Sequence, residues 1–418
     1  MKNYLIQNAT IVDEQSKWNG KKVDILIENN FIKKIAENII APEDYQLINY
    51  TNLHVSPGFI DVRANGCEPG YEWKETLESL SKAAEKGGYT SVCLSPETNP
   101  FVSSASQIEY ILQKAKNLPV KFMPVSGITK DGQGKELTEM FENFKAGTNL
   151  FFDGKKSISN SKLLALALQY ANDFGGKIFH YAFDKNFSTS LNINEGISAT
   201  KSGIKGTPAI SEEIIVARDI HIVRHLNIPI HFAGISSKGS IDLIRAAKKE
   251  GLAITCDVHI INLFFDDSVI QNFDSNYKVL PPLREESNRI AMLNAIADDT
   301  IDAIASDHSP QNIELKKVEF DLAEYGTITI ENTFSMAITA LEKFCTLSKI
   351  VNKFTIGPSG VIGDESVKIK EGEKACLTLY DPNQEIYPGN TPYSSLSSNT
   401  PFKGNIKLMG KIYQTIYS

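Results

Sequence analysis

The stretch VSPGFID (55–61) is followed by KETLESLSKAAEKGG (74–88) and then by YTSVCLS (89–95). The first and third runs are short and apolar, which favours buried strands. The middle run has helical periodicity and reaches Gly87, a typical helix stop. The same alternation continues, and the other apolar runs are KFMPVS (121–126), NLFFD (149–153), KIFHYA (177–182), IPIHFA (228–233), LAITCDV (252–258) and IDAIASD (301–307). Eight strands separated mainly by helices predict an α/β fold, a (β/α)8 TIM-like barrel.

A doubly wound open sheet is the alternative, but it needs no eighth strand and usually carries a glycine-rich phosphate loop, which this sequence lacks. Residues 1–55 and 365–418 instead alternate short β-branched runs with polar turns, and neither piece is long enough for a good core. We therefore expect them to form one composite β-sandwich domain beside a barrel of residues 56–364. The first barrel strand should end near Asp61, and the barrel interior should hold Val92, Leu94 or their neighbours, and Ile304.

Composition limits the function classes. The 418 residues carry 43 Lys+Arg against 50 Asp+Glu, a formal charge of −7, without a basic block for nucleic acid. No run of about 18 apolar residues predicts a membrane span. The five cysteines lack CxxC spacing and are interpreted as reduced thiols. We expect a soluble, cytoplasmic protein that binds neither nucleic acid nor membrane; self-association stays open.

Five motifs carry a resemblance to a known family. They are VSPGFIDVRANGCEPG (55–70), GGYTSVCLSPETNP (87–100), KVLPPLREESNR (278–289), AIASDHSP (303–310) and SSNTPFKG (397–404). Together they are similar to the dihydroorotase branch of the amidohydrolase superfamily, in the family's order. The resemblance implies a zinc-bearing barrel hydrolase that interconverts carbamoyl aspartate and dihydroorotate in pyrimidine biosynthesis. It also implies that a barrel-end aspartate, here Asp307, is the catalytic proton shuttle if the protein is active.

The chain departs from the family at the first motif. Where the family has His-x-His-x-Arg, with two zinc ligands and a substrate clamp, this sequence has Arg63, Asn65 and Cys67. A guanidinium has no free lone pair for a metal. Glu97 stands where the family's loop asparagine touches substrate, and it would repel an anion.

Other positions give a mixed picture. His180, Asp153 and Asp307 match family metal ligands and form a vestigial set with low expected occupancy. Gly234 replaces a metal histidine, and Leu280 replaces an asparagine, while Arg284 is retained. His231 is expected to be a packed, hydrogen-bonded strand residue, and the Lys155–Lys156 pair a solvated face.

Two hypotheses follow. The first is a catalytically inactive dihydroorotase-like protein, a pseudoenzyme without a cofactor. Inactive members of this family serve as scaffolds for aspartate transcarbamoylase, so that enzyme is the implied partner. The second is an active cyclic-amide amidohydrolase with a reduced, mononuclear zinc site. Under the first hypothesis Arg63 replaces the metal charge by pairing with Asp307, Asp61 or Asp153.

Overall fold

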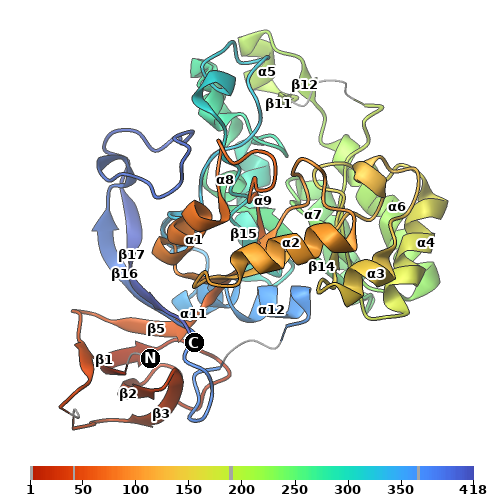
Figure 1. The fold of residues 1–418 in the computed structure, drawn as a ribbon. Helices are drawn as coiled ribbons and strands as arrows, with labels where there is room; N and C mark the ends of the chain where they lie inside the picture. The colour runs from red at the N-terminus through yellow and green to blue at the C-terminus, as the bar shows by residue number, and fades with distance from the viewer. Residues whose placement is uncertain (1–2, 41–42, 188–191, 365–367) are drawn as a thin grey trace.

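The computed structural model describes residues 3–40, 43–187, 192–364 and 368–418. Parallel strands at its centre follow the predicted runs, and helices surround them (Figure 1). The barrel strands are β6 (Phe59–Ala64), β7 (Tyr89–Leu94), β8 (Lys121–Pro124), β9 (Leu150–Phe151), β10 (Lys177–Tyr181), β13 (Ile230–Ala233), β14 (Ile254–His259) and β15 (Ala303–Ala305).

These strands pair in two groups, β6-β7-β8 and β9-β10-β13-β14-β15. Parallel bridges between Ser126 and Phe151, and between Ala64 and His308, join the groups at both seams. The strand order therefore runs around a ring, so the carboxyl ends of all these strands meet at one mouth.

The helices lie in the predicted gaps. The longer ones are α1 (Leu77–Lys86), α2 (Ala105–Ala115), α4 (Ser161–Asn172), α6 (Ile210–Leu226), α7 (Lys238–Lys249), α9 (Glu286–Ala297) and α10 (Thr333–Leu341). The shorter ones are α3 (Met140–Lys145), α5 (Ile197–Ser202), α8 (Ile260–Phe264), α11 (Leu347–Asn352) and α12 (Ile356–Ile362). A small parallel pair, β11 (Ile193–Asn194) and β12 (Gly206–Thr207), lies near α5. No helix among the described residues is long and apolar enough to cross a membrane.

A second sheet combines strands from both ends of the chain, which lie side by side in Figure 1. Its members are β1 (Tyr4–Ile11), β2 (Lys22–Glu28), β3 (Phe31–Ala36), β4 (Gln46–Ile48), β5 (His54–Pro57), β16 (Leu377–Ile386) and β17 (Leu408–Ile416). β5 pairs with β1 on one side and with β16 on the other. The predicted β domain built from both termini is therefore present beside the barrel.

Two strand-level predictions need correction. The run 55–61 divides at Gly58: its first part is β5 of the terminal sheet, and the barrel strand β6 continues to Ala64, beyond Asp61. Ile304, Val92 and Leu94 belong to the apolar cluster shared with the surrounding helices. The interior cluster includes Cys93, a neighbour that the prediction for this strand allowed, but it holds Ala303 and Ala305 in place of Ile304, since neighbouring strand residues face opposite sides of a sheet.

Candidate functional site

Arg63 lies at the carboxyl end of β6 and is buried in the barrel mouth. Its Nη2 is 2.6 Å from Oδ1 of Asp257, and its Nε is 3.5 Å from Oδ1 of Asp307. The predicted pairing of Arg63 with Asp307 is confirmed. The shorter contact is to Asp257, at the end of β14, which the sequence did not single out as the partner.

Lys155 and His259 complete this group of side chains. Lys155 Nζ is 2.8 Å from Asp307 Oδ2, and His259 Nδ1 is 3.1 Å from the same oxygen. His259 Nε2 is 2.6 Å from Arg63 Nη2, so it accepts from the guanidinium. The interpretation of Lys155 as a solvated lysine was wrong, because its side chain is only 13% exposed and forms this ion pair.

We call Arg63, Lys155, Asp257, His259 and Asp307 the mouth cluster. Burial alone would raise the pKa of both carboxyl groups, but nearby positive charge outweighs it. Arg63 and His231 hold the pKa of Asp257 well below its usual value. Protonated His259 would do the same for Asp307, as the charges of Lys155 and Arg63 do. Burial lowers the pKa of the His259 imidazole, so this ring is mainly neutral. Within the mouth cluster itself, two cations face two carboxylates.

Of the three metal-ligand candidates only Asp307 belongs to this cluster, whereas His180 and Asp153 have other partners. His180 Nδ1 is 2.6 Å from Asp219 Oδ2, while its Nε2 accepts the backbone N–H of Ile158 at 3.0 Å. Asp153 accepts hydrogen bonds from the backbone N–H and the hydroxyl of Thr129, at 2.8 and 2.6 Å. Across the described parts of the chain, no three His, Cys, Asp or Glu side chains are arranged to hold a metal ion. The residues present therefore do not fit the zinc that the family implies.

The position of Gly234 shows what fills the missing ligand's place. Its φ is +67°, and a Cβ there would lie 2.5 Å from Nε2 of His259. The imidazole of His259 thus occupies the space into which a side chain at position 234 would extend. His231 is packed as predicted, with Nε2 2.9 Å from Asp257 and Nδ1 2.9 Å from the Thr255 hydroxyl.

The other altered positions of the first motif are Asn65 and Cys67. The backbone N–H of Asn65 donates to the carbonyl of His308 at 2.8 Å. Cys67 is buried, and burial raises the pKa of its thiol to about 12, so a thiolate nucleophile is disfavoured.

The remaining candidates have structural partners. Glu97 accepts from the Ser95 hydroxyl at 2.9 Å and from the backbone N–H of Lys155 at 3.3 Å. Leu280 packs in the interior apolar cluster. The buried Arg284 donates to the Ser236 hydroxyl at 3.0 Å, as well as to other protein acceptors.

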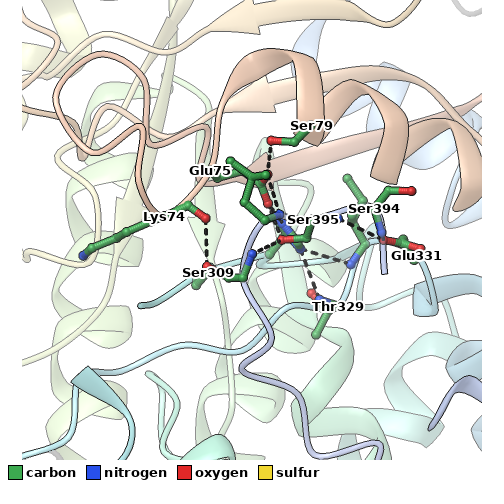
Figure 2. Close-up of polar contacts among 12 residues, drawn as sticks. Lys74, Glu75, Ser79, Ser309, Thr329, Glu331, Ser394 and Ser395 are labelled. Carbon is green, nitrogen blue, oxygen red and sulfur yellow. Dashed lines mark hydrogen bonds and ion pairs between the residues drawn. The ribbon is translucent and has the colours of Figure 1, made fainter. Parts of the chain in front are cut away.

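A buried network anchors the retained His308. Figure 2 shows Glu75, just before α1, lying between Ser79 and Ser395, and both hydroxyls donate to its carboxylate. His308 Nε2 is 3.3 Å from this carboxylate, and Nδ1 accepts the backbone N–H of Thr329 at 3.2 Å. The AIASDHSP and SSNTPFKG motifs meet beside this network, where the Asn399 amide donates to the carbonyl of Ser309 at 3.0 Å.

Asp61 gives a pH-dependent prediction. Burial raises the pKa of this carboxyl to about 6, although Ser306 donates to it through both its backbone N–H and its hydroxyl. In the unfolded chain the pKa of an aspartate side chain is about 3.9. Asp61 should therefore contribute most to stability below pH 4, and that contribution should be lost as the pH rises through 6. Between pH 4 and 7 we expect Asp61→Asn to become less destabilising relative to the parent by about 2–3 kcal/mol. Urea unfolding at several pH values measures this, and a difference independent of pH would contradict it.

Comparisons with known proteins agree with the fold. An L-hydantoinase (dihydropyrimidinase) from Arthrobacter aurescens superposes with a TM-score of 0.87 at 19% identity, over 100% of this chain and 95% of the other. A dihydropyrimidinase from Brevibacillus agri gives 0.83 at 20% identity, over 99% and 94%. The chain thus shares the fold of these two proteins, a barrel with a β-sandwich domain.

Sequence comparison is more specific. A family model described as dihydro-orotase-like matches residues 53–240. The dihydroorotase of Acetivibrio thermocellus is 35% identical over 416 residues, covering 99% of this chain and 97% of the relative. That of Geobacter metallireducens is 34% identical over 404 residues, covering 96% and 95%. The chain belongs to the dihydroorotase family.

Proposed function

We propose that the chain is a dihydroorotase-like protein of pyrimidine biosynthesis that lacks dihydroorotase activity and acts as a structural or regulatory partner of aspartate transcarbamoylase. The observation that carries the proposal is the mouth cluster, in which Arg63 bridges Asp257 and Asp307. A permanent cation therefore lies 3.5 Å from Asp307, one of the metal-ligand candidates, and donates to the neighbouring Asp257.

The donor atoms support this proposal. A zinc site needs at least three protein donors with available lone pairs. The Nε2 lone pair of His180 is directed at a backbone N–H, and both carboxylates of the mouth cluster are engaged by cations. A divalent ion roughly 4 Å from a guanidinium is opposed by about 8 kcal/mol at an effective dielectric of 20. Binding would require Arg63 and Lys155 to leave.

Substrate recognition supports it independently. Cys67 and Leu280 stand where the family has an arginine and an asparagine, and neither side chain offers a cation or an amide. Glu97 adds a negative charge at a position that would face an anionic substrate. A protein without these contacts would hold carbamoyl aspartate weakly, even with a metal present.

The second candidate is an active cyclic-amide amidohydrolase with one zinc ion. It is favoured by the full-length relatives named dihydroorotase at 34–35% identity, and by the retained His180 and Asp307. In that case Asp307 would act as the proton shuttle, and the mouth cluster would have to open.

The partner and the compartment belong to the same proposal. The altered residues lie at the barrel mouth, where they bind one another. The outer surface of the barrel therefore stays available for assembly, which suits a scaffold. The five cysteines are all free thiols, which suits the reducing cytoplasm. Nothing in the charge pattern favours a nucleic acid or membrane partner.

Affinity purification of the tagged chain from its native cells tests the partner. We expect aspartate transcarbamoylase to be retained at near-equal molar amount through size-exclusion chromatography, as measured by quantitative mass spectrometry. A tagged chain that elutes without this enzyme would contradict the partnership, whatever its own activity.

A further inference from the structure

Two buried lysines outside the barrel mouth lack a carboxylate partner. Lys278 and Lys316 are only 2% and 6% exposed. Lys278 Nζ donates to the carbonyls of Phe320 and Asp321 at 2.8 and 2.9 Å. Lys316 Nζ donates to the carbonyl groups of Glu324 and Gly326 at 2.7 and 3.0 Å. Among the described residues neither lysine forms an ion pair, so carbonyl groups, with the rings of Phe320 and Tyr325 beside Lys278, are the direct contacts of two buried ammonium groups.

Such an arrangement is costly unless a counter-charge is near, because moving an ammonium group out of water is unfavourable. Burial and the charge of Lys278 lower the pKa of Lys316 to about 7, and Asp274 and Glu324 offset this only in part. An anion bound beside Lys316 would therefore stabilise its charged form.

A pocket of about 360 Å³ lies directly beside Lys316. It is bordered by the 3-10 turns η3 (Ser275–Tyr277) and η4 (Ile313–Leu315) and by the segment that holds Lys403. Lys317 and Lys403 add two further cations to its wall, against one acid, Asp274, whose carboxylate is 3.9 Å from Lys403. This excess of positive charge is local, since the whole chain carries −7.

The rest of the pocket wall is partly apolar. Phe273 and Val318 contribute to it and are 49% and 40% exposed. Exposed apolar side chains beside grouped lysines suit a ligand with a charged end and a hydrophobic body. The pocket shares no residue with the mouth cluster.

We infer that this pocket binds a small organic anion, with a carboxylate or phosphate group near Lys316, Lys317 and Lys403 and an apolar portion against Phe273 and Val318. Lysines recognise such groups as point charges rather than through a bidentate fork. The inference does not rest on the proposed function, because it holds whether or not the barrel mouth is catalytic.

Isothermal titration calorimetry with phenyl phosphate and with benzoate tests the pocket and distinguishes the two kinds of anion. We expect one of them to bind saturably at one site per chain, more tightly than inorganic phosphate, and more weakly at 0.5 M salt. Lys317→Gln combined with Lys403→Gln should weaken that binding roughly tenfold. Lys82→Gln combined with Lys238→Gln, at exposed lysines on α1 and α7, should leave it unchanged.

Two outcomes would overturn the inference. One is the absence of saturable binding of either probe up to roughly 10 mM, the weak limit for a specific small-ligand site. The other is binding that both pairs of substitutions weaken equally, which would indicate general attraction of anions. Inorganic phosphate binding as tightly as phenyl phosphate would reject the apolar part of the ligand.

Discussion

Arg63→Met should destabilise the protein by about 3–5 kcal/mol, because removing one partner of a buried ion pair leaves the other without compensation. Asp257 would lose its closest cation, at 2.6 Å, and Asp307 would keep only Lys155. Urea unfolding followed by circular dichroism measures the loss. Arg224→Met, which breaks the exposed pair with Glu250 on the surface, is the matched control and should cost no more than about 1 kcal/mol.

A second substitution distinguishes charge from packing in this result. If uncompensated charge is the cause, Asp257→Asn should be destabilising alone but should recover at least about 1 kcal/mol in the Arg63→Met background, as coupled neighbours do. Asp257→Asn would then lower the stability of the parent protein but raise the stability of the Arg63→Met variant. Additive losses, or an Arg63→Met variant as stable as the parent, would contradict the account of the mouth cluster.

Gly234→Ala should lower the free energy of unfolding by about 2–4 kcal/mol, because the new Cβ overpacks the site and is strained at positive φ. The new methyl group would be placed 2.5 Å from His259 Nε2, the nitrogen that Arg63 already contacts at 2.6 Å, while Asp307 lies 3.1 Å from Nδ1 of the same ring. Gly251→Ala is the control for strain alone, because Gly251 has a φ of +86° but no atom within 4 Å of its Cβ position. It should cost about 1–2 kcal/mol.

The clash predicts a specific interaction with position 259. In a His259→Ala background the cost of Gly234→Ala should fall to that of the Gly251 control, because only the backbone strain remains. An unchanged cost in that background would show that His259 does not fill the space beside Gly234.

The fold could be predicted from sequence because its signals are local. Apolar runs such as residues 89–95 and 177–182 alternate with helix-patterned segments, and each became a barrel strand. The error at residues 55–61 has a physical cause. One apolar run supplies two sheets, and only Gly58, where a Cβ would meet Thr90 at 2.2 Å, marks the division.

The site was predicted less completely because it depends on contacts between distant strands. The substitution at position 63 indicated an Arg63–carboxylate pair, and the structure confirms the one with Asp307. Nothing in the order of residues shows that Asp257 lies closer, or that His259 occupies the space beside Gly234. One signal in the sequence could have indicated that Lys155 pairs with Asp307. Lys155 lies only two residues after Asp153, which is at the end of a strand.

The measurement that tests the central claim most directly combines zinc content and dihydroorotate hydrolysis on one preparation. The chain would be purified with added zinc, dialysed and analysed by mass spectrometry for metal, with the Acetivibrio thermocellus dihydroorotase treated in parallel as the positive control. We predict less than about 0.1 zinc per chain, since fewer than three protein donors are available, and no turnover above the protein-free rate. One zinc per chain together with turnover of dihydroorotate would contradict the account and establish the single-metal enzyme.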